Sequence, residues 1–358
     1  MKAVVLVGGE GTRLRPLTLT APKQMLPIVG VPMLERVLAQ LAAHGVDEAI
    51  LSLGHLPDAF MEAYPDGRAV GVSLIYAVEA EPLDTAGAVR FAATFGGVDD
   101  TFVVVNGDVL TDLDLTALLA FHHQRGAEGT IALHPVPDPS AFGVVPTDPE
   151  GRVTAFVEKP PRDKAPTNEI NAGTYVLETS VLDRIATSGR VSIERETFPA
   201  MVRDRRLFAL SDSGYWLDAG NPAAYLQANF DFVTGKRGRV VAPGLSDRGD
   251  GVLTEGVSSL EGLIVGPSAV FPGCQVHSGA RVERSVLGAG SVIGGGAVVL
   301  DSVLMEGCHV AEDAQVVGSI MGPHAIVGQR GDVRATSVLG AHAVVSSGMV
   351  VDGERVSG

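Results

Sequence analysis

The chain has 358 residues, of which 46% are hydrophobic and 19% charged, and its formal net charge is −15. This length and composition fit a globular protein with one large domain and a smaller one. The negative charge argues against a general nucleic-acid or membrane-surface binder, because such proteins normally carry a basic face. No basic and apolar leader opens the sequence, and no apolar run is long enough to span a membrane. We therefore expect a cytoplasmic protein that binds neither nucleic acid nor membranes.

The first part of the chain alternates predicted strands and helices. A β-branched run at 2–7 predicts a strand buried on both faces, and apolar residues at helical spacing over 32–44 predict the next helix. Then follow strands at 48–53 and 72–78, a helix at 85–95, a strand at 101–106 and a helix at 114–125. This order predicts an α/β fold with a Rossmann-like, mixed but mostly parallel sheet. Ligands of such sheets bind beyond the carboxyl ends of the strands.

After about residue 236 the pattern changes. Residues 237–262 are rich in Gly, Ser and Asp and are interpreted as a linker between a domain at 1–236 and another at 263–358. In the last domain aliphatic residues recur every six positions, which predicts the three-sided coils of a parallel β-helix rather than an antiparallel sheet. The predicted inward residues are Val270, Val276, Val282, Val286, Val292, Val298, Leu304, Val310, Val316, Ile320, Ile326, Val338, Val344 and Val350.

The two cysteines test this coil register. Cys274 and Cys308 occupy the same place in their coils, two coils apart. Stacked strands lie about 4.8 Å apart, so the two residues should be about 10 Å apart, beyond the reach of a disulfide. We expect both thiols to be free.

The loop after the first strand reads GGEGTRLRPLT. It lacks the third glycine of a dinucleotide fingerprint and the Gly-Lys-Ser/Thr of a Walker loop. Its glycines allow close backbone approach, and between Glu10 and Glu35 the only charged residues are the cations Arg13, Arg15 and Lys23. Arginine offers a planar fork for phosphate oxygens and lysine a point charge, so polyphosphate is the natural ligand.

Two carboxylates end apolar runs and are candidates for a metal site. Asp108 follows the strand in VVVNGDV, and Asp218 follows the apolar run in GYWLDAGNP. Either could be only a cap or turn residue. Together with a phosphate loop they suggest Mg²⁺, which is typically held by one or two carboxylates and phosphate oxygens. Glu158 and Lys159 could be a surface ion pair, or could bind the hydroxyls and phosphate of a sugar phosphate.

Other chemistries find less support. The sequence has no G-x-S-x-G, C-x-x-C or H-E-x-x-H motif. His122 and His123 lie late in an amphipathic helix, where a surface position is expected. Hexapeptide repeats also occur in acyltransferases, which use a histidine presented by a coil, but none of the candidates lies in a recognisable motif; they are His277, His309, His324 and His342.

The assembled motifs resemble the nucleotide-sugar pyrophosphorylases, also called sugar-1-phosphate nucleotidylyltransferases. The signature-like stretch LVGGEGTRLRPLTLTAPKQMLP is followed, in that family's order, by EPLDTAGA, VVNGDV, FGVV, FVEKP, NAGTYVL and YWLDAGNP. The greatest likeness is to the mannose-1-phosphate guanylyltransferases, whose bacterial members often carry a C-terminal, left-handed β-helix of hexapeptide repeats. The segment VSIERETFP also resembles part of that group.

The resemblance implies a role for each matching residue. Arg13 and Lys23 would grip the triphosphate, while Asp108 and Asp218 would hold Mg²⁺. The nucleotide would also contact Gly8, Gly9, Gly11, Thr12, Glu81, Gly87 and Gly107. The sugar 1-phosphate would contact Gly143, Glu158, Lys159 and Asn171. The implied reaction is attack by the sugar phosphate on the α-phosphorus of a nucleoside triphosphate, with release of pyrophosphate.

The best expectation for the substrates is GTP and mannose 1-phosphate. A carboxylate only accepts hydrogen bonds, and guanine offers two adjacent N–H donors, which Glu81 or Glu79 could read. The alternatives are a glucose-1-phosphate thymidylyl-, uridylyl- or adenylyltransferase, and a catalytically silent relative that senses nucleotide-sugars. Two positions depart from the family pattern: Asp84 stands where glycine is usual, and Gln24 where proline is usual. We expect the β-helix to mediate a homodimer or homotetramer.

Overall fold

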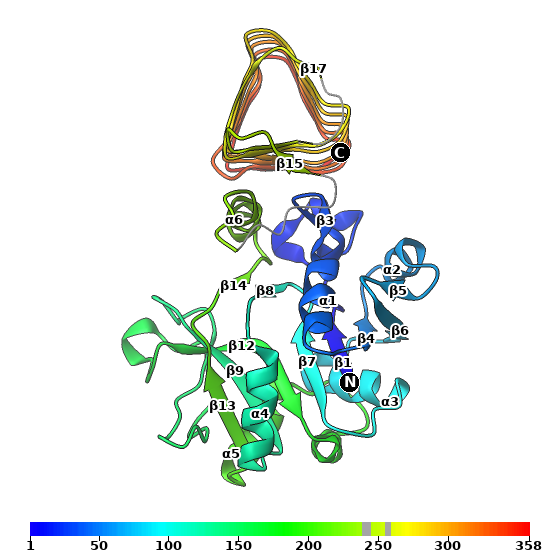
Figure 1. The fold of residues 1–358 in the computed structure, drawn as a ribbon, viewed down its shortest axis with the longest axis vertical. Coiled ribbons are helices and arrows are strands. Elements are labelled where there is room, and N and C mark those ends of the chain that lie inside the picture. Colours follow the sequence, from blue (N-terminus) through cyan, green and yellow to red (C-terminus); the bar gives the residue numbers. More distant parts are fainter. Residues whose placement is uncertain (238–244, 255–258) are drawn as a thin grey trace. The chain divides into compact units, whose positions relative to one another are not determined.

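The computed structural model describes residues 1–237, 245–254 and 259–358, and the chain forms two compact units (Figure 1). The first unit contains Met1–Gly9 and Leu34–Leu217, and the second contains Glu10–Met33 and Asp218–Gly358. Residues 10–33 therefore leave the first unit directly after the first strand and pack with the C-terminal part of the chain. We call residues 10–33 the cationic segment.

The centre of the first unit is a parallel sheet, as the sequence predicts. Strand β1 (Lys2–Leu6) pairs in parallel with β4 (Glu48–Leu53) and with β7 (Phe102–Asn106), and β4 pairs in parallel with β6 (Val72–Val78). These strands match the predicted ranges to within a residue or two. Because they are covered on both faces, they are rich in fully buried residues such as Val4, Ile50 and Val104.

Antiparallel strands extend the sheet beyond β7 and make it mixed. Strand β12 (Glu169–Leu177) lies antiparallel to both β7 and β9 (Gly129–Pro135). The remaining strands of the unit are β5 (Arg68–Ala69), β8 (Val109–Thr111), β10 (Gly143–Val144), β11 (Val157–Glu158), β13 (Leu207–Ser211) and β14 (Trp216–Asp218), the last of which ends in the second unit.

The helices of the first unit pack against this sheet. Helix α3 (Asp84–Phe95) contacts β1, β4 and β6, and α4 (Leu115–Arg125) contacts β9, β12 and β13. Sequence signals fix the ends of α4, because the Asp114 side chain accepts a hydrogen bond from the backbone N–H of Ala117 and Gly126 adopts the left-handed conformation after the last turn. The other helices are α1 (Met33–Ala43), α2 (Pro57–Ala63), α5 (Phe198–Arg203) and a π-helical turn (Ile193–Thr197).

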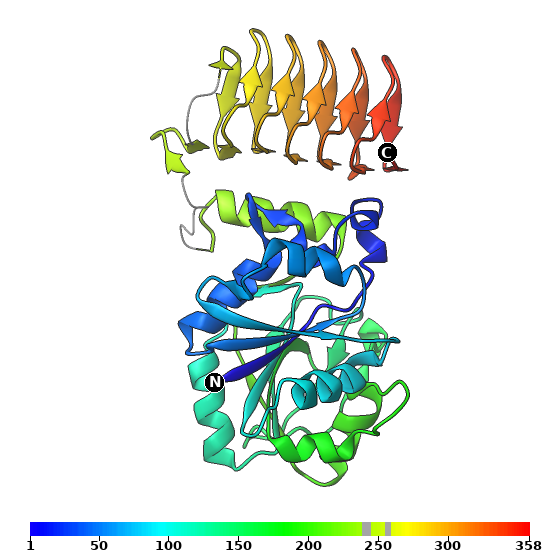
Figure 2. The same cartoon turned by 90° about the vertical axis from the view of Figure 1, so that its right-hand side faces the viewer.

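The second unit contains a β-helix whose three sheets form the sides of triangular coils (Figures 1 and 2). Their strands pair in parallel, except that β15 (Ser246–Asp247) lies antiparallel to β16 (Val252–Thr254). The first sheet contains β15 (Ser246–Asp247), β16 (Val252–Thr254), β19 (Ser268–Val270), β22 (Val286–Leu287), β25 (Val303–Leu304), β28 (Ile320–Met321), β31 (Val338–Leu339) and β34 (Arg355–Val356). The second contains β17 (Ser259–Leu260), β20 (Gln275–Val276), β23 (Val292–Ile293), β26 (His309–Val310), β29 (Ile326–Val327) and β32 (Val344–Val345). The third contains β18 (Leu263–Val265), β21 (Arg281–Glu283), β24 (Val298–Leu300), β27 (Gln315–Val317), β30 (Asp332–Arg334) and β33 (Val350–Asp352).

The remaining elements of this unit are α6 (Pro222–Val233) and the short pair β2 (Pro27–Ile28) and β3 (Val31–Pro32) in the cationic segment. Parts of the expected linker, residues 238–244 and 255–258, lie outside the described residues. Within the described part of 237–262, β16 already pairs in parallel with β19, and Val252 belongs to the core of the β-helix.

The predicted inward residues are correct in the first and third groups but wrong by one position in the others. In the second group the residues inside the β-helix core are Leu287, Ile293 and Val299, and Val286, although buried, lies outside this core. The fourth and fifth groups shift in the same way, to Met321, Val327, Leu339, Val345 and Val351, and leave Ile326, Val344 and Val350 exposed. Each error falls on a pair of adjacent aliphatic residues, whose side chains point to opposite faces of a strand. Successive coils are 17 or 18 residues long, and the strand register between them shows which residue of each pair points inward.

The prediction for the cysteines is confirmed. Cys274 and Cys308 are both free thiols, fully buried and two coils apart. Burial raises the pKa of Cys308 to about 12 and also raises the pKa of Cys274. Both residues are therefore small core residues rather than reactive groups.

Candidate functional site

The cationic segment begins with a tight turn that only glycine fits comfortably. Gly11 has φ +61°, and a Cβ added there would lie 2.9 Å from Cγ2 of Thr18 and 3.1 Å from Cβ of Lys23. The Thr18 hydroxyl also donates to the Gly11 carbonyl oxygen at 2.9 Å. The segment then runs through three 3-10 turns, at Thr12–Leu14, Leu17–Leu19 and Lys23–Met25. Gly11 thus brings Lys23 close to the start of the loop.

The two arginines of this segment have acidic partners. The Arg13 guanidinium lies 3.7 Å from Oδ2 of Asp218, and its side chain is 61% exposed. Oδ1 of Asp218 accepts a hydrogen bond from the backbone N–H of Gly220 at 2.8 Å, which fixes the carboxylate. Arg15 pairs with Glu10 at 2.7 Å. The structure therefore brings together Arg13 and Asp218, predicted as a phosphate contact and a metal ligand.

Three predicted phosphate-side residues, Gly8, Gly107 and Asp108, follow β1 and β7 in the first unit. Gly8 packs against Gly54, where an added Cβ would lie 2.9 Å from the Gly8 carbonyl oxygen. Gly107 donates its backbone N–H to the Leu6 carbonyl oxygen at 3.0 Å, which aligns the ends of the two parallel strands. Asp108 comes next, two residues after the end of β7 at the carboxyl-end edge of the sheet, and is 8% exposed. Gly9 and Thr12 are exposed.

The two candidate base-reading carboxylates, Glu79 and Glu81, both lie in the loop at 79–87 but differ in their contacts. Glu79 accepts hydrogen bonds from the Ser52 hydroxyl at 2.8 Å and from the Leu83 backbone N–H at 3.1 Å. Both carboxylate oxygens of Glu79 are thus engaged in hydrogen bonds within the protein. Glu81, by contrast, is exposed. Asp84 has φ +61° and is exposed at the start of α3. This backbone conformation explains why glycine suits that position, and aspartate is among the few other residues that tolerate it.

A hydrogen-bonded clamp in this region was not predicted. The Thr85 hydroxyl donates to Glu194 at 2.8 Å and accepts from the backbone N–H of Ile193 at 2.8 Å. Gly87 lies beneath it, and its backbone N–H donates to the carbonyl oxygen of Val191 at 3.2 Å. The motifs EPLDTAGA and VSIERETFP, distant in sequence, therefore form one substructure. Their joint presence in the sequence was the available signal.

The predicted sugar-phosphate residues meet on neighbouring strands of the first unit. Gly143 in β10 pairs directly with Glu158 in β11. A Cβ at Gly143 would lie 2.7 Å from the Phe156 ring and 3.0 Å from Oε2 of Glu158, so the glycine makes room for both. Lys159 is 62% exposed, and its ammonium lies 3.3 Å from Oε1 of Glu158.

Asn171 belongs to the next strand and is oriented by its own strand. Its amide donates to the Tyr175 hydroxyl at 2.9 Å, and its oxygen accepts from the Gly173 backbone N–H at 3.0 Å. Beside it, Trp216 donates from its indole N–H to the Ala172 carbonyl oxygen at 2.9 Å and stacks on His134. Sequence reasoning missed the Trp216 side chain, although it lies within the motif that ends in Asp218.

Gln24 is a polar exception in the cationic segment. Its side chain is 1% exposed, and neither the amide nitrogen nor the amide oxygen has a hydrogen-bond partner. Unsatisfied groups of this kind typically cost about 1–3 kcal/mol each. The position at which the chain departs from the family pattern is therefore also a source of local instability.

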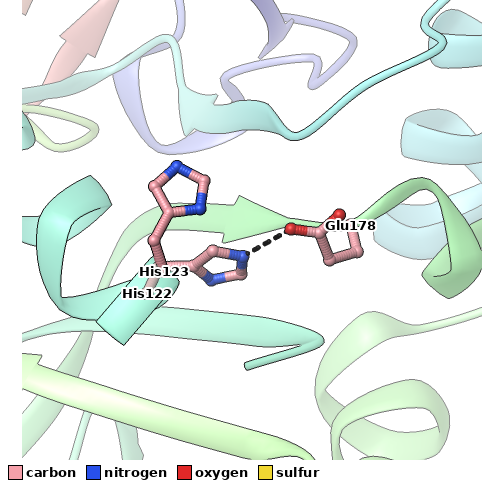
Figure 3. Close-up of side chains that lie close together, drawn as sticks. All are labelled: His122, His123 and Glu178. Carbon is pink, nitrogen blue, oxygen red and sulfur yellow. Dashed lines mark hydrogen bonds and ion pairs between the residues drawn. The ribbon is translucent and has the colours of Figure 1, made fainter. Parts of the chain in front are cut away.

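The prediction that His122 and His123 both lie on the helix surface is wrong for His122. It is 1% exposed, because this face of α4 packs on β9 and β12, whereas His123 is exposed. Figure 3 shows the two rings beside Glu178. The ring nitrogens of His122 hydrogen-bond with the Thr130 hydroxyl at 2.8 Å and with Glu178 at 2.9 Å. A metal-ligand set is geometrically close here, but both nitrogens of His122 are already used, so the residue is a satisfied core histidine.

The carboxylates proposed for a metal suit Mg²⁺ by their chemistry. Asp108 and Asp218 supply hard oxygen donors, and neither has a histidine or cysteine as a neighbour in sequence. They belong to different units, Asp108 to the first and Asp218 to the second.

The fold and these residues are those of a nucleotidyltransferase, and comparison with known proteins agrees with this class. The family model for the nucleotidyl transferase domain matches residues 2–234, and the model described as the GMPPB C-terminal domain matches residues 261–358. A mannose-1-phosphate guanylyltransferase of Mycobacterium tuberculosis is 42% identical over 302 residues, which cover 83% of this chain and 82% of that protein. A UTP–glucose-1-phosphate uridylyltransferase of Synechocystis is 34% identical, with 85% and 87% covered.

A solved structure is also similar. HddC of Yersinia pseudotuberculosis, in a structure with GMP-PN, matches with a TM-score of 0.55 and 28% identity, over 64% of this chain and 99% of that one. The chain belongs to the nucleotidyl transferase family. It is an enzyme of the EC 2.7.7 type, which transfers nucleotidyl groups. Among the described residues, no helix has the length and apolar character needed to cross a membrane.

Proposed function

We propose that this protein transfers the guanylyl group of GTP to mannose 1-phosphate in a magnesium-dependent reaction, giving GDP-mannose and pyrophosphate. The observation that carries the proposal is the Arg13–Asp218 pair at 3.7 Å. Arg13 belongs to the cationic segment, which has three cations and no acidic residue after Glu10. Relatives named as mannose-1-phosphate guanylyltransferases, at 36–43% identity, support the choice of substrates.

The reaction needs positioned charge rather than a strong base. An oxygen of the sugar phosphate attacks the α-phosphorus of the nucleotide in line, the bond between the α-phosphorus and its bridging oxygen to the β-phosphate breaks, and pyrophosphate leaves. The sugar phosphate is already an anionic nucleophile, and pyrophosphate is already a good leaving group. Arg13 and Lys23 hold the phosphate oxygens in this geometry and stabilise the charge that develops on them.

The metal is assigned to Asp108 and Asp218. When bound, Mg²⁺ supplies additional neutralisation of phosphate charge and helps to orient the reacting groups. The Gly220 backbone N–H fixes Oδ1 of Asp218, and Oδ2, which lies 3.7 Å from Arg13, would be the oxygen that holds the metal. The burial of Asp108 limits competition from water.

The sugar phosphate is assigned to the first unit. Glu158 accepts hydrogen bonds from sugar hydroxyls, Lys159 neutralises the phosphate, and Asn171 donates from its amide. The close approach of Gly143 to Glu158 leaves backbone rather than side chain beside the ligand.

Base preference is assigned to Glu81. Glu79 uses both carboxylate oxygens to hold its own loop, so the exposed Glu81 is the better candidate for accepting the two adjacent N–H groups of guanine. A second candidate function is the same reaction with UTP and glucose 1-phosphate, and the observation in its favour is the likeness to the Synechocystis uridylyltransferase.

Self-association through the β-helix is part of the proposal. Ile326 and Val344 are 39% and 60% exposed and are register partners on adjacent coils. Such a neighbouring pair of exposed aliphatic side chains suits a contact with a second copy of the chain. Light scattering on the full chain tests this, with Ile326→Glu expected to lower the mass to that of a monomer.

The test of the reaction is a panel. The protein is incubated with Mg²⁺, each of four nucleoside triphosphates and a set of sugar 1-phosphates, and the release of pyrophosphate is measured. We expect the fastest release from GTP with mannose 1-phosphate. Fastest release from UTP with glucose 1-phosphate would replace this assignment with the second candidate, and no release from any pair would contradict the proposed function.

A further inference from the structure

One corner of the β-helix lies against the cationic segment. Five residues hold equivalent places in successive coils, since each donates its backbone N–H to the strand of the next coil: Phe271, Gly288, Met305, Gly322 and Gly340. Three of the five contact residues 10–33, all within the second unit. A Cβ on Gly30 would meet the Phe271 ring, one on Gly322 would lie 2.9 Å from Cδ2 of Leu17, and one on Gly340 would lie 3.1 Å from Cβ and Cγ of Pro16.

Buried residues of the segment, among them Pro16 and Leu17 that meet this corner, alternate with its cations. Leu14, Pro16 and Leu17 are buried, whereas Arg13 and Arg15 are exposed. Arg15 is bonded directly to Pro16, and Arg13 is two residues further back. Any displacement of the buried residues is therefore passed to the arginines through very few backbone bonds. The corner supports the side of the segment opposite its positive charge.

The lack of a side chain at Gly340 is explained by its contact with the cationic segment rather than by the backbone of its own coil. The two nearest atoms to a Cβ at this position would be Cβ and Cγ of Pro16 at 3.1 Å, and the third nearest is the Val356 carbonyl oxygen at 3.5 Å, an ordinary contact distance. Its φ is not in the left-handed region. By contrast, a Cβ at Gly322 would also lie 2.8 Å from the backbone of Gly340 and Ala341. The absence of a side chain at 340 thus makes room for the cationic segment specifically.

We propose that this corner of the β-helix, at Phe271, Gly322 and Gly340, positions the nucleotide-binding Arg13, with Gly340 setting the place of Pro16. The corner touches no substrate, so Gly340 is a positioning residue for the reaction. The proposal rests on the proposed function, in which Arg13 and its neighbours hold the triphosphate. It gives the β-helix a part in catalysis as well as in assembly.

The test compares two glycine-to-alanine variants of the full chain. Gly340→Ala pushes on Pro16, whereas Gly295→Ala is a matched control in another corner, where the added Cβ would meet only the Ser278 carbonyl oxygen at 3.3 Å. We expect Gly340→Ala to raise the KM for the nucleotide about tenfold and to lower kcat. The KM for the sugar phosphate should stay within twofold, since its residues lie in the first unit. Gly295→Ala should match the wild type.

Hydrogen exchange provides a readout that does not depend on activity. In Gly340→Ala, the amides of residues 12–20 should exchange at least fivefold faster than in the wild type, with exchange in the first unit unchanged. Wild-type exchange and wild-type KM for the nucleotide would overturn the inference, as would an equal rise of both KM values. If the wild-type protein releases no pyrophosphate from any pair, the proposed function fails, and the exchange result still decides whether the corner positions the segment.

Discussion

The residues predicted for the two substrates fall into two halves, the sugar-phosphate side in the first unit and the cationic side in the second, and the two are held by different kinds of structure. The sugar-phosphate side is fixed by strand register: Gly143 pairs with Glu158, and Asn171 pairs with Leu133. The cationic side consists of short 3-10 turns, held by Thr18 and by contacts from residues some 300 positions further along the chain. Local backbone bonding suffices for the first half, whereas the second half depends on packing from distant parts of the sequence. Substitutions should therefore act on one substrate at a time.

The largest effect is expected from Arg13→Ala. Removing a preorganised group that stabilises transition-state charge typically costs about 10²–10³ in kcat, and the KM for the sugar phosphate should change little. Steady-state kinetics with both substrates varied measures this. Arg248→Ala, which removes an exposed arginine paired with Asp250, is the control and should have wild-type kinetics. Near-normal turnover of Arg13→Ala would remove this residue from the mechanism.

A smaller and opposite pattern is expected from Glu158→Gln. The variant keeps the shape but replaces a charged acceptor, and losing one such hydrogen bond to a sugar hydroxyl corresponds to about tenfold in binding. The KM for the sugar phosphate should therefore rise about tenfold, with an unchanged KM for the nucleotide. Glu150→Gln, on an exposed turn of the same unit, serves as the comparison. A rise in the nucleotide KM alone would place Glu158 on the other half of the site.

A stability effect is expected from Gln24→Met. The substitution replaces a buried amide without partners by an apolar side chain of similar volume, so the free energy of unfolding should rise by about 1 kcal/mol. Chemical denaturation measures this. A fall in stability would contradict this prediction, because it would mean that the buried amide of Gln24 makes a favourable interaction.

The smallest effect concerns pH and a residue that belongs to neither half. Burial lowers the pKa of His122 in the folded protein, so the unfolded chain takes up the proton first as the pH falls. The stability contributed by neutral His122 is complete above its unfolded pKa, about 6.5, and is lost as the pH drops below that value. His122→Gln should flatten the stability profile below about pH 6.5, whereas the exposed His123→Gln should not. An unchanged slope in His122→Gln would show that another group causes the pH dependence of stability in this range.

Local sequence patterns predicted the sheet but could not predict how the cationic segment is held. The runs at 48–53 and 72–78 form strands β4 and β6 with the predicted bounds, because short runs of mostly apolar residues, rich in Ile, Val and Leu, favour strands. Adjacent aliphatic pairs such as Val344-Val345 left the β-helix register ambiguous by one residue. The contacts of Pro16 with Gly340 depend on the packing of distant residues, which no local pattern encodes.

The central claim is that the α-phosphorus of the nucleotide is attacked by the sugar phosphate. It is tested most directly by incubating the wild-type protein, Mg²⁺ and mannose 1-phosphate with GTP labelled at the α- or the γ-phosphorus. We predict that the α-label appears in the nucleotide-sugar and the γ-label in pyrophosphate. Transfer of the γ-label to the sugar phosphate, or no labelled nucleotide-sugar, would contradict the account.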